Sequence, residues 1–406
     1  MSRRPGPFTH ILAITTLNAA AVYAVRPMIS YRALQLGAGP FEIGLIASSY
    51  AAFALFAALL IGRWTDRFGP HRFLVAGAAL VGVSALSASW IGSVPGLGVA
   101  NALIGLGQIM NLVAMQTVVA NQAARRERDE RFGFYTMAAS GGQLIGPAAA
   151  GFLAGYASTD ATGANLNLTP VFVFAAILAG ASLILSVALR GSYLAPASRR
   201  SEEQPNHLSA AWSVLRRPSI PQAMASSLSV VLSTDLLVAY LPAYGEANAL
   251  PVELVGVLLA LRAGGSMVSR LLMGRLIRWI GRGPVLAGSL LLAGLGFAAL
   301  PLLPHPVVLV GLMLLLGLGL GLGQPMSIAW IANRVPRDQR GTALGVRLTA
   351  SRLGQLVLPS LMGAIAGAAG LAAMFWALAA VLGSASGMVW RTEFDDAEID
   401  EEGAPP

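Results

Sequence analysis

The charged side chains within long apolar segments are the residues of this sequence whose types and positions could do chemistry. They are Arg26, Asp235, Arg262, Arg347 and Arg352. A charge inside an apolar span is costly unless it pairs with another group or faces water, so such residues usually mark a binding or gating site. Arginine outnumbers aspartate four to one in this set. Arg262 and Arg352 could bind an anionic group of a ligand or bond helix carbonyls in a structural role, and both alternatives stay open.

Covalent catalysis and metal binding find no support among the other reactive side chains. The sequence has no cysteine, which excludes disulfides and thiolate metal sites. Its four histidines are scattered and form no ligand cluster: His10, His71, His207 and His305. The glycine-rich run 317–323 lies inside an apolar segment with no preceding strand, which favours close helix packing over a phosphate-binding loop. We expect a protein that is not an enzyme and that holds no metal and no cofactor.

The apolar segments that must position these charges are too long and too many for a water-soluble protein. Of the 406 residues, 55% are hydrophobic and 11% are charged, and the mean hydropathy is +0.67. That leaves too little polar surface to cover a soluble globule. A membrane-spanning helix needs roughly 20 apolar residues. Twelve segments meet this rule: 9–29, 41–61, 73–92, 96–119, 133–157, 168–189, 220–242, 252–273, 284–303, 306–331, 342–367 and 370–390. The sequence predicts an all-α membrane protein with twelve transmembrane helices.

The arginines between these segments predict the orientation in the membrane. All 27 basic residues are arginine, and 22 of them fall in the termini and connections of one side, against Arg32 alone in the connections of the other. Positive charge gathers on the cytoplasmic side of membrane proteins. Both termini are therefore expected in the cytoplasm, with the chain integral to a bacterial-type inner (plasma) membrane. The net charge of +8 comes from short clusters rather than from one basic face, so no nucleic-acid partner is expected.

Composition also divides the chain into parts. Residues 191–219 are polar, charged and proline-bearing, which predicts a cytoplasmic linker between two bundles of six helices, 1–190 and 220–391. The acidic tail 392–406 is predicted to be disordered. We expect a monomer surrounded by membrane lipid.

The two bundles carry an internal repeat with an offset of 212 residues. Gly62 and Arg63, in the connection after the second segment, match Gly274 and Arg275 after the eighth. Five residues of the fifth segment map onto the eleventh with the same offset: Gly133, Gly142, Gln143, Pro147 and Gly151 onto Gly345, Gly354, Gln355, Pro359 and Gly363. Two separate regions in one register indicate structural repeats, so the two bundles are expected to be pseudo-symmetric.

Both regions also resemble motifs of a known family, the major facilitator superfamily, and the resemblance covers nearly the whole chain. The connection 62–72, GRWTDRFGPHR, resembles the loop motif Gly-x-x-x-Asp-Arg-x-Gly-Arg-Arg, with Pro70-His71 in place of the usual basic pair. The fifth segment resembles the antiporter motif of drug:proton exporters with twelve helices, with Ala150 in place of one glycine. The fourth segment departs from that type, because Asn101 precedes the Gly-x-Gly pair where these exporters usually carry arginine.

The resemblance implies a latch and a gate between the bundles. Asp66 is expected beside the start of the eleventh helix, near Gly341 and Thr342, where helix N-terminal amides stabilise a carboxylate. The latch residues are those of the loop motif: Gly62, Asp66, Arg67, Gly69 and Arg72. In this family the first and seventh helices face each other near the outer side. The 212-residue offset then places Asp235 opposite Tyr23, one turn from Arg26, and so predicts an outer gate formed by Arg26 and Asp235.

The same fold implies a central cavity for a small-molecule substrate, lined by the first and fourth helices. Candidate hydrogen-bonding groups there are Asn18, Asn101, Gln108 and Asn111, although each could instead join two helices. Arg26, Asp235, Arg262 and Arg352 complete the candidate substrate or gating residues. The glycines and proline of the antiporter-type helix would let the fifth helix bend and pack closely: Gly142, Gly146, Pro147 and Gly151.

Export of a small amphipathic compound by alternating access is the leading function, with protons as the candidate driving ion. Proton coupling stays open because Asn101 replaces the expected arginine. Organic anions are the alternative cargo, which the surplus of arginine favours. A membrane sensor or scaffold on the same fold is the alternative of another class.

Reporter fusions test the orientation. A reporter attached after Arg391 should be active only in the cytoplasm, and one inserted at Thr162 only outside, because the arginine-rich connections stay in the cytoplasm. Paired reporters that require opposite compartments, such as a cytoplasmic fluorescent protein and a periplasmic phosphatase, measure this. The reverse pattern would overturn the orientation and the assignment of the outer gate.

Overall fold

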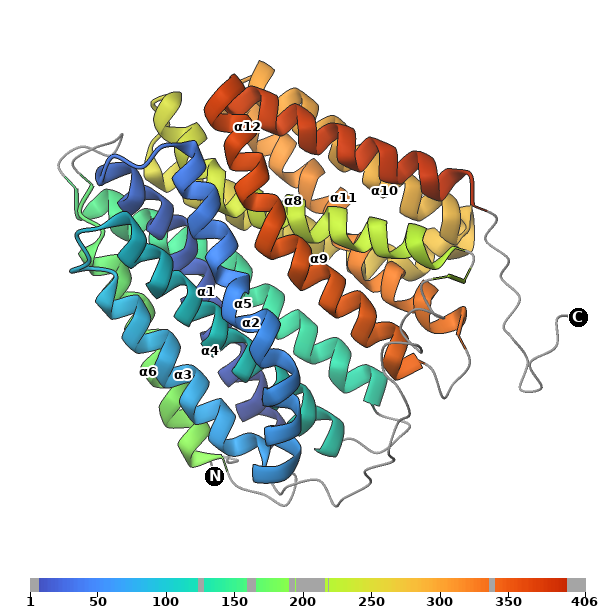
Figure 1. Ribbon diagram of the computed structural model, residues 1–406, viewed down its shortest axis with the longest axis horizontal. Coiled ribbons are helices and arrows are strands. Elements are labelled where there is room, and N and C mark those ends of the chain that lie inside the picture. The colour runs from blue at the N-terminus through green and yellow to red at the C-terminus, as the bar shows by residue number, and fades with distance from the viewer. Residues whose placement is uncertain are drawn as a thin grey trace, which may run out of the picture.

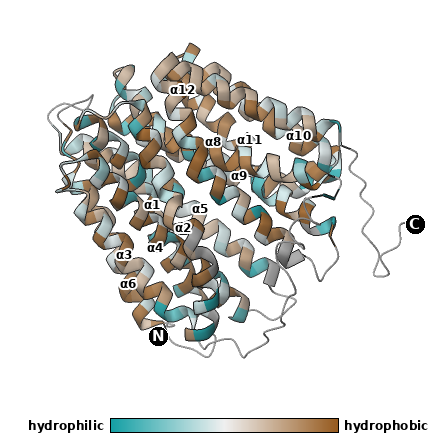
Figure 2. Ribbon diagram, viewed as in Figure 1, coloured by the Kyte–Doolittle hydropathy of each residue, from teal (hydrophilic) through white to brown (hydrophobic). Residues whose placement is uncertain are grey.

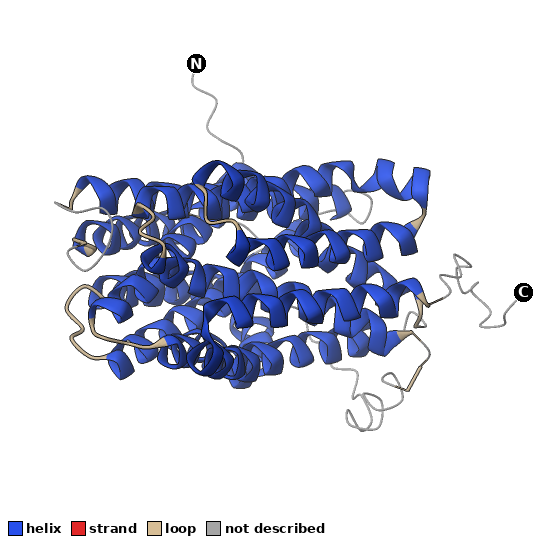
Figure 3. Cartoon of the chain, turned by 90° about the horizontal axis from the view of Figure 1, so that it is seen from above, coloured by secondary structure: helices blue, strands red, loops and turns tan. Residues whose placement is uncertain are grey.

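The computed structural model describes residues 7–122, 128–158, 166–189, 194, 216–217, 219–335 and 340–392. These residues form helices with short connections and contain no strand (Figure 1, Figure 3). The elements are α1 (Pro7–Gln35), α2 (Pro40–Phe68), α3 (Pro70–Ser87), α4 (Val94–Gln122), α5 (Arg128–Tyr156), α6 (Thr169–Ala188), α8 (Ile220–Ala247), α9 (Val252–Ile280), α10 (Arg282–Ala299), η2 (Leu300–Leu302), α11 (Pro306–Asn333) and α12 (Arg340–Trp390). Gly370 divides α12 into two helices, with a φ of 87°. The all-α fold with twelve helices is confirmed.

Proline and glycine fix where several of these helices begin and end. Pro40, Pro70 and Pro306 stand in the first turn of α2, α3 and α11, where the missing N–H leaves no helical bond unmade. Gly69 joins α2 to α3 with a φ of 81°, and Gly281 joins α9 to α10 with a φ of 92°. Glycine adopts this conformation without a steric cost. Because these glycines are 212 residues apart, the two halves make the same turn at the same place in the repeat.

The helices form two groups. Helices α1 to α6 pack among themselves, and so do α8 to α12. The two groups touch mainly where α2 packs on α12, α5 on α9, and α1 on α8. In Figure 1 the groups meet near the start of α2 and diverge toward the start of α12. Two pseudo-symmetric bundles, as the repeat predicts, therefore face each other across α1, α2, α5, α8, α9 and α12.

Helix ends differ from the predicted spans. α2 continues to Phe68, beyond the predicted end at 61, and α5 begins at Arg128, before the predicted start at 133. Because helical backbone hydrogen bonds continue through polar residues, a helix can extend beyond the apolar segment that predicts it. Most of 191–219 and of 392–406 lies outside the described residues, and the limits of the linker and the tail stay predictions.

Large apolar side chains stand exposed on the outside of both bundles. Val83, Ile184, Leu295 and Val307 are between 58% and 74% exposed, which water would disfavour and lipid would not. Figure 2 shows hydrophobic residues along the outer helices. In the described part of the chain, nine helices are long and apolar enough to cross a membrane. α2 and α5 are not among them, and both pack against the opposite bundle.

Two helix crossings with the same construction join the bundles at one end of the molecule. Gly44 of α2 lies against Pro359 and Gly363 of α12, and Gly256 of α9 lies against Pro147 and Gly151 of α5. Every residue of the second crossing is 212 positions from its counterpart in the first. A Cβ atom on Gly44 would lie 2.5 Å from the carbonyl oxygen of Pro359, and one on Gly256 would lie 2.5 Å from that of Pro147. These backbones approach as closely as they do because the side chain is missing.

Two hydrogen bonds reinforce the crossing of α2 and α12. Tyr240 Oη donates to the carbonyl of Pro40 at 2.7 Å, and the hydroxyls of Ser48 and Ser360 are 2.7 Å apart. At the other crossing the repeat places alanine at both serine positions, Ala260 and Ala148. The shared backbone contact is therefore supplemented by polar bonds on one side of the molecule.

Adding one methyl group at the first crossing should force this end apart. We expect Gly44→Ala to raise several-fold the rate at which a water-soluble maleimide labels a cysteine introduced at Ser48, which is buried. The chain has no cysteine of its own, so labelling reports that position alone. Gly367→Ala, where no atom lies within 4 Å of the new Cβ, is the matched control. Equal labelling in both backgrounds would show that the crossing does not depend on glycine.

Candidate functional site

A cavity of about 260 Å³ lies between the two bundles. Helices α1, α2, α4 and α5 line it on one side, and α8, α11 and α12 on the other. Its wall combines amides, tyrosines, aliphatic side chains and three charged groups, Arg26, Asp235 and Arg352. Polar groups that fix the orientation of a ligand are typical of a small-molecule site, and this wall offers them beside aliphatic side chains.

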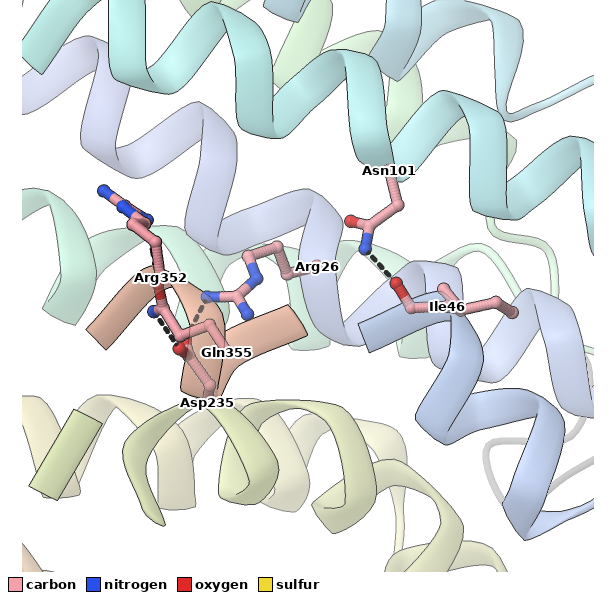
Figure 4. Close-up of polar contacts among 6 residues, drawn as sticks. All are labelled: Arg26, Ile46, Asn101, Asp235, Arg352 and Gln355. Carbon is pink, nitrogen blue, oxygen red and sulfur yellow. Dashed lines mark hydrogen bonds and ion pairs between the residues drawn. The ribbon is translucent and has the colours of Figure 1, made fainter. Parts of the chain in front are cut away.

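Arg26 and Asp235 form an ion pair across the bundle interface. Arg26 Nη1 of α1 donates to Asp235 Oδ1 of α8 at 2.8 Å (Figure 4). Arg26 is 7% exposed and Asp235 is 9% exposed. The guanidinium also lies over the ring of Tyr50, 4.2 Å from its centroid, and 5.9 Å from that of Tyr23. Each charge is thus withdrawn from water and compensated by a partner on the opposite bundle.

Gln355 of α12 joins this pair to a third charge. Its Nε2 donates to Asp235 Oδ2, so both carboxylate oxygens have a partner. Its Oε1 accepts from Arg352 Nη1 at 2.9 Å (Figure 4). One amide therefore connects Asp235 to Arg352. The sequence analysis named Gln355 only as the repeat partner of Gln143 and did not include it among the site residues. The repeat was the signal that could have identified it, since both glutamines line the cavity.

Three of the four predicted amide residues form a connected group on the wall opposite α12. Asn18 Nδ2 donates to Gln108 Oε1 at 2.7 Å, and Asn111 Nδ2 donates to Asn18 Oδ1 at 3.2 Å. All three line the cavity. Asn101 does not, since its Nδ2 donates to the carbonyl of Ile46 at 2.6 Å and joins α4 to α2 beside Arg26 (Figure 4).

Three further arginines lie within the helices away from this cavity wall. Arg262 of α9 is 3% exposed and does not line the cavity. Arg347 Nη1 donates to Ser227 Oγ at 2.8 Å. Arg270 bonds the carbonyl of Gly321 and, across the bundle interface, Ser140 Oγ at 2.9 Å. The sequence analysis counted Arg270 with the arginines of the cytoplasmic side, although it falls inside the predicted span 252–273. The structure places it within α9, which continues to Ile280.

The antiporter-type helix contacts both bundles. Gly142 and Gly146 lie against α1 at Ala19 and Ala20, while Pro147 and Gly151 form the crossing with α9. Small residues on two faces of α5 thus let it approach one helix of each bundle.

The predicted latch is described only in part. Gly69 forms the turn between α2 and α3, no atom lies within 4 Å of a Cβ on Gly62, and the guanidinium groups of Arg67 and Arg72 lie 5.1 and 5.9 Å from the Phe68 ring centroid. The side chain of Asp66 lies outside the described residues, as do those expected to face it. The latch stays a prediction.

Comparisons with known proteins agree with this architecture. The family model described as Major Facilitator Superfamily matches residues 11–306 and 223–404. "Multidrug resistance protein 2" of Bacillus subtilis is 29% identical over 114 residues, 28% of each chain. An uncharacterized MFS-type transporter of Methanocaldococcus jannaschii is 21% identical over 367 residues, covering 90% of this chain and 92% of that one. A mutant of the nucleoside transporter NupG has a TM-score of 0.77 at 13% identity, covering 95% of this chain and 98% of that one, which indicates a shared fold.

Exchanging the two charges tests the gate. Asp235→Asn or Arg26→Gln leaves one buried charge without its partner, a change that costs roughly 3–5 kcal/mol in proteins where it has been measured. We expect each single change to lower stability and transport, and the double change Arg26→Asp with Asp235→Arg to recover part of both. Denaturant unfolding in detergent and flux in proteoliposomes measure the two effects.

A different result would assign Asp235 another role. If this carboxylate carries the coupling proton, the exchanged double variant stays inactive, and Asp235→Asn retains solute exchange while losing its pH dependence. If all three variants are as stable and active as the parent, the pair neither gates nor couples.

Proposed function

The chain belongs to the Major Facilitator Superfamily, and we propose that it is a secondary transporter that exports a small amphipathic compound. As a member of this family it is an integral membrane transporter. The observation that carries the proposal is the cavity between the bundles, which the Arg26–Asp235 pair and the two glycine crossings close on one side. A site of this kind becomes accessible to the other side of the membrane when the bundles rock against each other.

The direction of access follows from the predicted orientation. The glycine crossings lie near the connection 36–39, which the arginine distribution places outside. The cavity is then shut toward the outside, and the bundles diverge toward the cytoplasm. This is the state in which an exporter takes up its cargo.

The wall of the cavity supports an amphipathic cargo. Asn18, Gln108 and Asn111 offer hydrogen-bonding groups, while Met115 and Tyr135 offer apolar surface. A relative whose name says multidrug resistance supports export rather than uptake. The matched segment is 28% of that relative, so export by this chain rests on the site together with the family.

Asp235 is the group proposed to couple export to protons. Among the described residues that line the cavity it is the one carboxylate, and it shares this wall with Arg26, Arg352, Tyr23 and Tyr50. Protonation would remove the charge that holds Arg26, and so would weaken the closure toward the outside. A driving ion acts in this way when it binds one conformation more tightly than the other.

Flux measurements test the proposal. We expect inverted membrane vesicles that contain the protein to accumulate amphipathic aromatic dyes at least several-fold above vesicles without it, and a collapsed pH gradient to abolish the difference if protons drive export. A variant with Arg26→Gln and Asp235→Asn together, which leaves the net charge of the cavity wall unchanged, is the transport-deficient control. Dyes of positive, zero and negative charge should be compared. Absence of flux for every dye would favour a membrane sensor or scaffold.

A further inference from the structure

Resting on the proposed function, we propose that the exported compound carries a carboxylate and that Arg352 binds this group in the central cavity. The proposal starts from the charge balance inside the bundles. In the described helices, five arginines lie within the interior: Arg26, Arg262, Arg270, Arg347 and Arg352. Asp235 compensates one of them, and both of its oxygens are already bonded.

Arg352 differs from the other arginines in where its charge points. It lines the cavity, which Arg262, Arg270 and Arg347 do not. Its partner is the neutral amide of Gln355, and its Nε is buried without a hydrogen-bond partner among the described residues. Figure 4 shows its guanidinium directed away from Asp235. A cation in a half-buried position without an acidic partner is unfavourable, and an entering anion would relieve this.

A carboxylate suits this position better than a neutral group. Guanidinium binds carboxylate through two parallel N–H···O bonds, and such charge-assisted bonds are roughly twice as strong as neutral ones. Among the described residues, Nη2 of Arg352 has no hydrogen-bond partner, and neither has its buried Nε, so one edge of the guanidinium is unpaired. The opposite wall, with Asn18, Gln108 and Asn111, would bind the rest of the cargo through neutral hydrogen bonds.

Binding at Arg352 would also reach the ion pair between the bundles. Gln355 accepts from Arg352 and donates to Asp235. A carboxylate that takes Arg352 as its partner competes with the Gln355 oxygen and so changes the position of the amide that bonds Asp235. A single side chain, Gln355, therefore connects the residue that would bind the cargo to the ion pair that closes the cavity.

The test uses three probes of one shape and different charge: 2-naphthoate, 2-naphthamide and 2-naphthylmethylammonium. We expect purified protein in detergent to bind naphthoate at least tenfold more tightly than the amide, and the ammonium weakest. In Arg352→Gln this preference should fall to about one, and Arg352→Lys should keep part of it. Arg347→Gln removes a charge from the same helix outside the cavity wall and should keep the preference. Unfolding of each variant without ligand checks that it is folded.

Other outcomes overturn the proposal. They are binding of the amide or the ammonium as tight as that of naphthoate, binding of no probe, or a preference for naphthoate that survives in Arg352→Gln. Flux of the same probes into inverted vesicles separates this inference from the proposed export. Preferential binding without flux would retain the carboxylate site and refute export. Flux of neutral or cationic probes without preference for the acid would retain export and refute the carboxylate site.

Discussion

A carboxylate and a guanidinium withdrawn from water must stay together, and this constraint governs the contact between the two bundles. Asp235 belongs to one bundle and Arg26 to the other, so separating the bundles at this point exposes both charges to water or leaves them unpaired. Gln355 occupies the remaining carboxylate oxygen, and tyrosine rings cover the guanidinium. The bundles can therefore part here only when water, a proton or another ion takes over the role of the lost partner.

The repeat supplies a symmetric frame, and substitutions within it supply the site. Both glycine crossings and both turn glycines keep the 212-residue offset. The charged residues do not, because Asp235 corresponds to Tyr23, Arg26 to Val238, and Arg262 to Tyr50. Backbone contact between bundles tolerates only small residues, so it preserves the repeat. A site for one asymmetric molecule gains nothing from symmetry, and its residues have diverged between the halves.

Sequence reasoning reached the features that follow from long stretches of chain. Spans, turns and the division into bundles depend on hydropathy, proline and glycine, which can be read locally. The juxtaposition of Arg26 and Asp235 was predictable from the repeat together with the family's arrangement, and the structure places the two in contact. The turn of Asn101 toward Ile46 and the bridging position of Gln355 depend on side-chain directions at helix crossings, which no spacing specifies. The bond of Arg270 to Ser140 of the opposite bundle is of the same kind, because a count of basic residues does not specify it.

The surplus of positive charge bears on how such a cavity can change its access. An empty cavity with Arg352 unmatched is more stable when it is open to water on one side, because water solvates the cation. Alternating access requires the cavity to pass through a state closed on both sides, where that solvation is lost. A cargo carboxylate on Arg352 would supply the missing charge and lower the free energy of this closed state more than that of the open one. The same interaction that selects the cargo would then make the conformational change conditional on its presence, which limits leakage through an empty transporter.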